Sequence, residues 1–139
     1  MPEFSKTSKE RLATCHQDLQ ALFNEVIKYF DCTVSCGFRN ERDQNEALRK
    51  GNTKLSFPHS KHNKTPSIAV DVYPYPVNFN NPKYNLQCYY FGGFVMGIAR
   101  KLKEEGKIKS KIRYGGDWNR NNLTYDESFL DLPHFEIDN

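Results

Sequence analysis

Hydrophobic side chains recur at helical spacing through the N-terminal part of the chain. From Leu12 to Phe30 they form one continuous stripe, which predicts a single amphipathic helix. Thr7 and Glu10 precede this stripe with the spacing of a capping box, a pair of side chains that accept each other's backbone N–H groups at a helix start. We therefore expect one long helix that buries its apolar face in a core.

Two further helices are indicated by their end signals. One is predicted from a cap at Asn40 to the residues before Gly51, and the other over residues 86–105, ending at Gly106. Three glycines inside the last helix would each cost about 1 kcal/mol relative to alanine, so we expect them to permit a close approach to a sheet. They are Gly92, Gly93 and Gly97.

Four short segments are predicted as strands, and two of them carry polar residues on one face. Side chains alternate faces along a strand, so in residues 68–72 Asp71 points away from its apolar neighbours. In residues 133–137 the same alternation places His134 and Glu136 together, opposite two apolar residues. Each of these strands thus has a core face and a polar face. The other two predicted strands are residues 33–38 and 111–114.

The composition is typical of one small domain covering residues 1–139. A chain of 139 residues with 37% hydrophobic and 14% aromatic content can form one compact core. The net charge of +3 arises from mixed charges rather than a basic block, so nucleic acid is not an expected partner. No run approaches the roughly 20 apolar residues of a membrane span. Residues 1–11 lack the apolar stretch of a signal peptide, so we expect the protein to be made in the cytoplasm without membrane insertion. We also expect it to be a monomer.

The polar residues of the two strands suggest a metal site. A catalytic zinc takes three protein ligands from His, Asp or Glu and leaves its fourth position to water. His62, on a polar loop, together with Asp71 and His134 would supply such a set. No two cysteines have zinc-finger spacing, so all four are predicted to be reduced and mostly structural. These are Cys15, Cys32, Cys36 and Cys88.

Five short motifs occur in order from about Arg39 to the C-terminus. As a set they resemble those of the zinc peptidoglycan peptidases of the hedgehog/DD-peptidase fold. The resemblance is strongest to the phage endolysins that are L-alanyl-D-glutamate endopeptidases, with D-alanyl-D-alanine carboxypeptidases as relatives. The motifs are Gly37-Phe38-Arg39 with Gln44, Ser60-Lys61-His62, Ala69-Val70-Asp71, Arg113-Tyr114-Gly115-Gly116-Asp117-Trp118, and Asp131-Leu132-Pro133-His134-Phe135-Glu136.

The resemblance implies a role for each residue of the site. His62, Asp71 and His134 would hold Zn²⁺, Asp131 would be the general base, and Arg39 would bind the scissile carbonyl or a substrate carboxylate. The implied fold is α+β, with a central antiparallel sheet, helices packed on one face and the zinc cleft on the other. Further residues expected to contact substrate are Ser60, Gln44, Trp118 and Tyr73.

The implied function is zinc-dependent hydrolysis of a peptide bond in the bacterial peptidoglycan stem peptide. A phage enzyme of this kind would reach the wall after the membrane is permeabilised. A D-alanyl-D-alanine carboxypeptidase or dipeptidase is the enzymatic alternative, and a non-catalytic zinc-stabilised binding module is an alternative of another class.

Each assignment also has a plainer interpretation. Asp71 could form a buried salt bridge, because a buried carboxylate needs either a partner or a metal. Asp131 could be one of several acidic loop residues, and Arg39 could form an ordinary ion pair. Glu136 is a competing candidate for the general base, or it orients a metal ligand.

Overall fold

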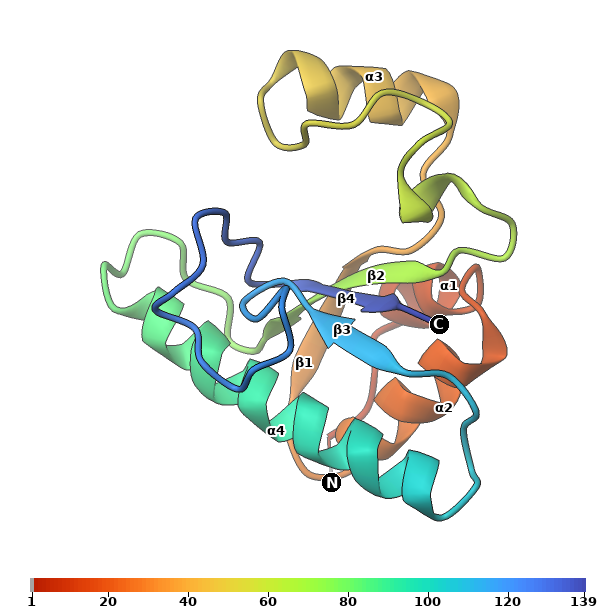
Figure 1. Ribbon diagram of the computed structural model, residues 1–139, viewed down its shortest axis with the longest axis vertical. Helices are drawn as coiled ribbons and strands as arrows, with labels where there is room; N and C mark the ends of the chain where they lie inside the picture. Colours follow the sequence, from red (N-terminus) through yellow and green to blue (C-terminus); the bar gives the residue numbers. More distant parts are fainter. Residues whose placement is uncertain (1) are drawn as a thin grey trace.

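The computed structural model describes residues 2–139 and contains a four-stranded sheet, four α-helices and one short 3₁₀-helix (Figure 1). Every predicted strand is present, with ends that differ from the predicted ones by at most two residues. The elements in chain order are α1 (Lys6–Leu12), α2 (Gln17–Val26), β1 (Cys32–Cys36), α3 (Glu41–Arg49), η1 (Lys61–Asn63), β2 (Ala69–Pro74), α4 (Tyr84–Glu104), β3 (Ile112–Tyr114) and β4 (His134–Ile137).

The sheet has the strand order β1-β2-β4-β3, and every neighbouring pair is antiparallel. In the register between β2 and β4, Asp71 lies directly opposite His134. Residues opposite each other on adjacent strands have their side chains on the same face. Two of the predicted metal ligands are therefore brought together by strand pairing alone.

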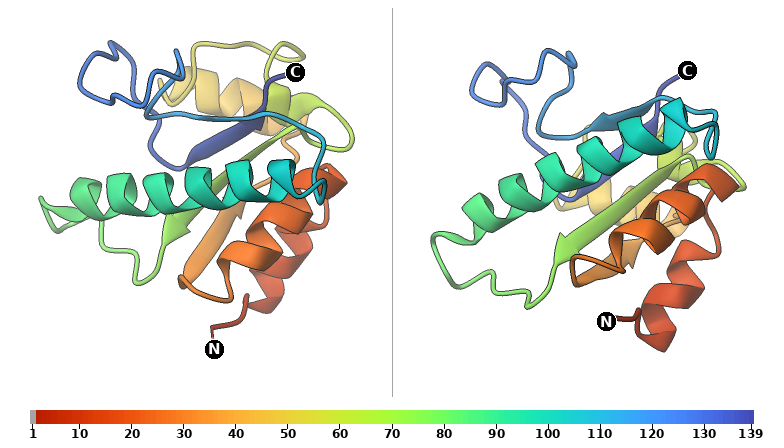
Figure 2. Two further views of the ribbon diagram at one scale, coloured as in Figure 1. Left: turned by 60° about the horizontal axis from the view of Figure 1, so that its bottom comes forward. Right: turned by 90° about the horizontal axis from the view of Figure 1, so that it is seen from below.

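Helices α2 and α4 cover one face of the sheet, and α1 lies along the β1 edge, where Ser8 and Arg11 bond to the backbone of Val34 (Figure 2). The core between them is built from the apolar face of the strands and from aromatic rings. Phe135 of β4 is fully buried and packs edge-on against Phe23 of α2 and Phe91 of α4, with ring centroids 5.3 and 6.2 Å apart. Helix α3 stands apart from the other three, beyond the opposite side of the sheet (Figure 1). The predicted α+β class is confirmed.

The predicted single N-terminal helix is wrong, because the chain forms two helices there. Residues 13–16 leave the helical path, and His16 N donates to Ser67 O while Ser67 N donates to Thr14 O. These long-range bonds tie the break to the segment before β2, so tertiary contacts override the helical pattern. The predicted capping box is also wrong. Ser5 caps α1, and the His16 ring accepts a hydrogen bond from Asp18 N at the start of α2.

Helix α4 passes close to the sheet at only one of its three glycines. A Cβ on Gly92 would lie 2.3 Å from Cζ of Tyr114, so the tyrosine ring of β3 occupies the space that a side chain would need. Gly93 and Gly97 have no neighbour within 4 Å of such a Cβ, so the expectation of close approach is confirmed for Gly92 and wrong for the other two. Gly106, with φ +73°, ends the helix as predicted.

Two further expectations concern cysteines and membranes. The four cysteines are free, as predicted. Within residues 2–139, none of the helices combines the length and the apolar content needed to traverse a bilayer.

Candidate metal centre

A cleft of about 840 Å³ opens on the polar face of the sheet, opposite helices α2 and α4. The polar residues of β2 and β4 form its floor, among them Asp71, His134 and Glu136. Residues 52–55 and 59–62 line one side of it, and Trp118 with residues 127–129 and Asp131 lines the other. The segments that were predicted to be loops therefore surround the polar face of the sheet.

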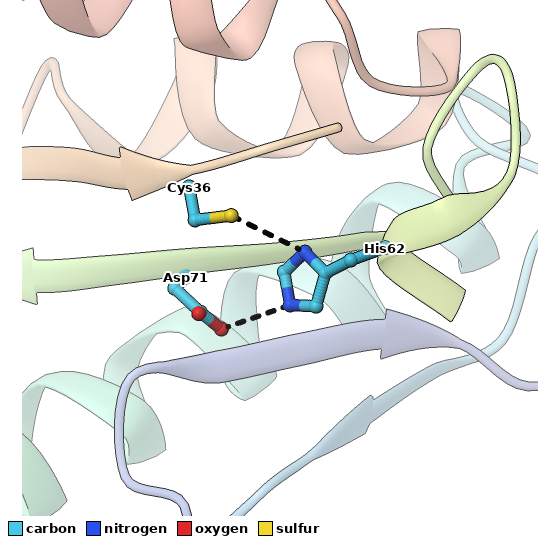
Figure 3. Close-up of side chains that lie close together, drawn as sticks. All are labelled: Cys36, His62 and Asp71. Atoms are coloured by element: carbon cyan, nitrogen blue, oxygen red, sulfur yellow. Dashed lines mark hydrogen bonds and ion pairs between the residues drawn. The ribbon is translucent and has the colours of Figure 1, made fainter. Parts of the chain in front are cut away.

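His62 is the most buried of the three predicted ligands, with 2% of its surface exposed. Its position is set by η1, whose cap is Ser60: the hydroxyl of Ser60 accepts a hydrogen bond from His62 N at 3.2 Å. Nδ1 lies 2.8 Å from the carbonyl oxygen of Gly37, so this nitrogen carries the proton and donates. Nε2, the other ring nitrogen, faces Asp71 Oδ1 at 3.3 Å (Figure 3).

His134 is oriented in the same way by a different acceptor. Its Nε2 lies 2.8 Å from Oε1 of Glu136, two residues further along β4, and donates to this carboxylate. Its Nδ1 then faces Asp71 Oδ1 at 3.2 Å and Asp131 Oδ2 at 3.8 Å. In both histidines, therefore, one ring nitrogen is fixed by an acceptor while the other is turned toward Asp71.

The electrostatics of this cluster favour added positive charge. Burial alone would raise the pKa of Asp71, but His62 and His134 hold that pKa well below its usual range. Burial alone would lower the pKa of His62, but Asp71 raises it to about 10. Burial opposes protonation of His134 as well, yet hydrogen bonds to Asp71 and Glu136 raise its pKa to about 9. A buried carboxylate thus draws protons onto both rings when no other cation is near.

Two pairs of these donor atoms have the spacing of a tetrahedral metal ion, while the potential ligands that lie within 4.8 Å of one another form two groups that share Asp71: Cys36, His62 and Asp71, and Asp71, Asp131 and His134. Ligand atoms about 2.0–2.1 Å from a tetrahedral zinc lie about 3.3 Å from one another. Oδ1 of Asp71 lies 3.3 Å from Nε2 of His62 and 3.2 Å from Nδ1 of His134. In residues 2–139, Nε2 of His62 is a buried side-chain atom without any hydrogen-bond partner, which is the expected condition of a ligand atom.

Asp131 and Glu136 both lie beside His134, but their carboxylates differ in exposure and in hydrogen bonding. The Asp131 side chain is 32% exposed and makes no hydrogen bond within the described part of the chain, and burial together with Asp71 raises its pKa. Glu136 is 6% exposed, and its Oε2 lies 2.8 Å from both Lys61 Nζ and Arg113 Nη2. Despite burial, its hydrogen bonds, of which that to His134 contributes most, lower its pKa to about 2.

Arg39 contacts Asp71 on the side away from the two histidines, and Gln44 supports Arg39. Nη2 of Arg39 is 3.6 Å from Oδ2 of Asp71, the carboxylate oxygen that does not face the histidines. Nη1 of Arg39 donates to Oε1 of Gln44 at 3.0 Å. Gln44 is fully buried and does not line the cleft, which favours a supporting role, and its contact with substrate stays a prediction.

The other predicted substrate contacts, Ser60, Trp118 and Tyr73, all line the cleft. The hydroxyl of Ser60 already caps η1. Trp118 lies against His134, with ring centroids 5.4 Å apart, and its Nε1 donates to Phe129 O at 2.9 Å. Their contact with substrate stays a prediction.

Sequence reasoning missed several neighbours of the site. Cys36 lies with its Sγ 3.8 Å from Nδ1 of His62 (Figure 3), because a register shift in β1 sets Cys36 opposite Asp71. The thiol faces the nitrogen that already donates to Gly37, and Cys36, His62 and Asp71 have potential ligand atoms within 4.8 Å of one another. The pairing of Lys61 and Arg113 with Glu136 was also missed, since contacts between distant segments leave no local pattern.

The chain is similar in sequence and in fold to known peptidases. Residues 2–137 match the family model described as phage L-alanyl-D-glutamate peptidase. A curated relative, the L-alanyl-D-glutamate peptidase of Escherichia phage T5, is 26% identical over 128 residues, which is 90% of this chain and 88% of the relative. The crystal structure of the Serratia marcescens L-Ala D-Glu endopeptidase ChiX superposes with a TM-score of 0.66 at 23% identity, over 98% of this chain and 90% of that one.

Proposed function

Because the chain belongs to the phage L-alanyl-D-glutamate peptidase family, we propose that it hydrolyses the L-alanyl-D-glutamate bond of the peptidoglycan stem peptide as a zinc-dependent endopeptidase. The protein would act as a single-domain monomer on the cell wall, after the membrane has been permeabilised. The observation that carries the proposal is the convergence of two oriented imidazoles on Oδ1 of Asp71 at the floor of an open cleft.

In this proposal the metal is held by Nε2 of His62, Oδ1 of Asp71 and Nδ1 of His134. Two nitrogens and one carboxylate oxygen are a donor set that suits zinc. When bound, zinc supplies a Lewis acid that polarises the scissile carbonyl and lowers the pKa of water to about 7. Gly37 and Glu136 act by fixing which nitrogen of each ring is free to coordinate.

Asp131 is the proposed general base. Its carboxylate is close to His134, and no hydrogen bond from residues 2–139 occupies its oxygens. It would accept a proton from the attacking water as the new C–O bond forms at the alanyl carbonyl. The same proton would then pass to the glutamyl nitrogen as the C–N bond breaks, which releases a free carboxylate and a free amine.

Arg39 is proposed to stabilise negative charge on the carbonyl oxygen. Its guanidinium contacts Asp71 and Gln44 through two of its nitrogens, and the side chain keeps 17% exposure at the cleft. A fixed cation is effective where charge grows during the reaction, because it needs no reorganisation at that moment.

Digestion of purified peptidoglycan followed by mass spectrometry tests the proposal. The zinc-loaded protein should create new termini at L-Ala and D-Glu, and chelation should prevent them. Release of terminal D-Ala instead would identify a carboxypeptidase, and no cleavage despite bound zinc would favour a binding module. Asp131→Asn is the matched inactive control, because it should retain zinc while losing the proposed base.

A further inference from the structure

Four lysine and arginine side chains line the cleft, and three of them already have a carboxylate partner. Arg39 lies 3.6 Å from Asp71, while Lys61 and Arg113 both contact Glu136 at 2.8 Å. Lys54 differs from these three, since within residues 2–139 no carboxylate oxygen lies within 4.0 Å of its ammonium group. The cleft therefore offers a single lysine or arginine charge that is not neutralised by the protein itself.

The backbone around Lys54 is fixed although its side chain is exposed. The carbonyl of Leu55 accepts a hydrogen bond from Nε2 of Gln44 at 2.7 Å, and Leu55 N donates to the hydroxyl of Thr53 at 3.1 Å. Gln44 is fully buried and is bonded through its other amide atom to Arg39. The segment that carries Lys54 is thus attached to a buried network that reaches the metal centre.

A line of rings connects Lys54 to the metal centre along the opposite wall. Nζ of Lys54 lies 5.2 Å from the ring centroid of Phe129, across the cleft from its own segment. Phe129 stacks on Trp118 with centroids 6.0 Å apart, and Trp118 lies 5.4 Å from the ring of His134. The rings of Phe129 and Trp118 therefore lie between the ammonium group of Lys54 and His134, a predicted metal ligand.

We propose that Lys54 binds the free carboxylate of the D-glutamyl residue on the leaving side of the scissile bond. This inference rests on the proposed function and adds the group that selects an acidic residue there. A glutamyl residue within a peptide keeps one carboxylate free, and an ammonium group that has no carboxylate partner in the described residues is the complement it requires. The aromatic wall would pack against the aliphatic part of the same residue, so that charge and shape are recognised together.

Two synthetic stem peptides test the proposal, one with the free D-glutamyl carboxylate and one with this group converted to a carboxamide. The wild-type protein should cleave the acidic peptide with a kcat/KM about five- to tenfold higher, mainly through a lower KM, as expected for one partly exposed ion pair. Lys54→Gln should abolish this preference by weakening only the acidic substrate, and Lys54→Arg should retain most of it. Lys64→Gln is the matched control, because Lys64 is exposed and does not line the cleft.

The possible outcomes separate this inference from the proposed function. Equal cleavage of both peptides by the wild type, or an unchanged preference in Lys54→Gln, would overturn the role of Lys54 while leaving the peptidase intact. Cleavage of neither peptide by the wild type would instead contradict the proposed function. Thermal unfolding and zinc binding of each variant should match the wild type, since Lys54 is exposed and makes no hydrogen bond with its side chain in the described residues.

Discussion

Replacing Glu136 by glutamine should destabilise the protein and weaken zinc binding, although the residue is neither a proposed ligand nor the proposed base. Its carboxylate accepts hydrogen bonds at 2.8 Å from His134, Lys61 and Arg113, and its side chain is only 6% exposed. Glutamine keeps the size and one acceptor oxygen, so the substitution removes the charge and little else. Two cations would then face a neutral group in a largely buried position.

The expected loss in the free energy of unfolding depends on the partners that Lys61 and Arg113 keep when the Glu136 charge is removed. Breaking a buried ion pair by removing one partner costs about 3–5 kcal/mol. Lys61 and Arg113 keep 31% and 27% side-chain exposure and remain 3.6 and 3.8 Å from Asp138. Water and Asp138 would therefore offset part of the loss, and we expect the free energy of unfolding to fall by about 2–3 kcal/mol.

Two measurements check this prediction. Urea unfolding of the metal-free protein gives the free energy of unfolding directly. Competition with a chelator should show zinc affinity lower by about 10–100-fold, because His134 loses the anion that orients it. Asp138→Asn is the control and should cost less than about 1 kcal/mol, since its contacts to the same cations are longer and more exposed. A Glu136→Gln variant with near wild-type stability and unchanged zinc affinity would refute the reasoning.

Three further predictions concern other parts of the chain. Asp131→Asn should lower kcat/KM about 10²–10⁴-fold with zinc affinity retained, as read from peptide hydrolysis and metal competition. Gly92→Ala should destabilise the protein by about 1–3 kcal/mol in thermal or urea unfolding, because its Cβ would overlap Tyr114, whereas Gly93→Ala has free space and should be neutral or stabilising by up to about 1 kcal/mol. Burial tends to raise the pKa of Asp18, but hydrogen bonds from the segment after α4 lower it below 3.8. Its contribution should therefore be complete above pH 3.8 and be lost as the pH falls below that value, and Asp18→Asn should flatten the pH dependence of unfolding in this range.

The floor of the site could be predicted from the sequence because it depends on local alternation. In β2 and β4 the period of two places Asp71 and His134 on the polar face whatever the exact strand ends are. Antiparallel pairing then needs only the correct register to bring them together. The break between α1 and α2 could not be predicted in this way, since it depends on hydrogen bonds to Ser67, far along the chain.

Gln44 shows why residue roles are harder to predict than residue positions. A polar residue on a helix next to a motif arginine is compatible with substrate contact, and nothing in its local sequence indicates full burial. Gln44 is buried because the segment around Leu55 folds back over α3, and the Gln44 amide donates to the carbonyl of Leu55. This contact is between separate segments of the chain. The same arrangement presents Lys54 to the cleft, so the supporting residue and the proposed specificity residue have one structural cause.

Glu136 and Asp131, the two carboxylates beside His134, suit different roles because their hydrogen bonds differ. Glu136 has three strong donors on its two oxygens and is held in place by the sheet, so it can orient a ring but has no free position for a substrate proton. Asp131 precedes β4 on the connection from β3, is partly exposed and keeps both oxygens available. A general base must reach the reacting water and take up its proton, which only the less constrained carboxylate can do. The position that makes Glu136 a good anchor thus argues against it as the base and supports the proposal that Asp131 has that role.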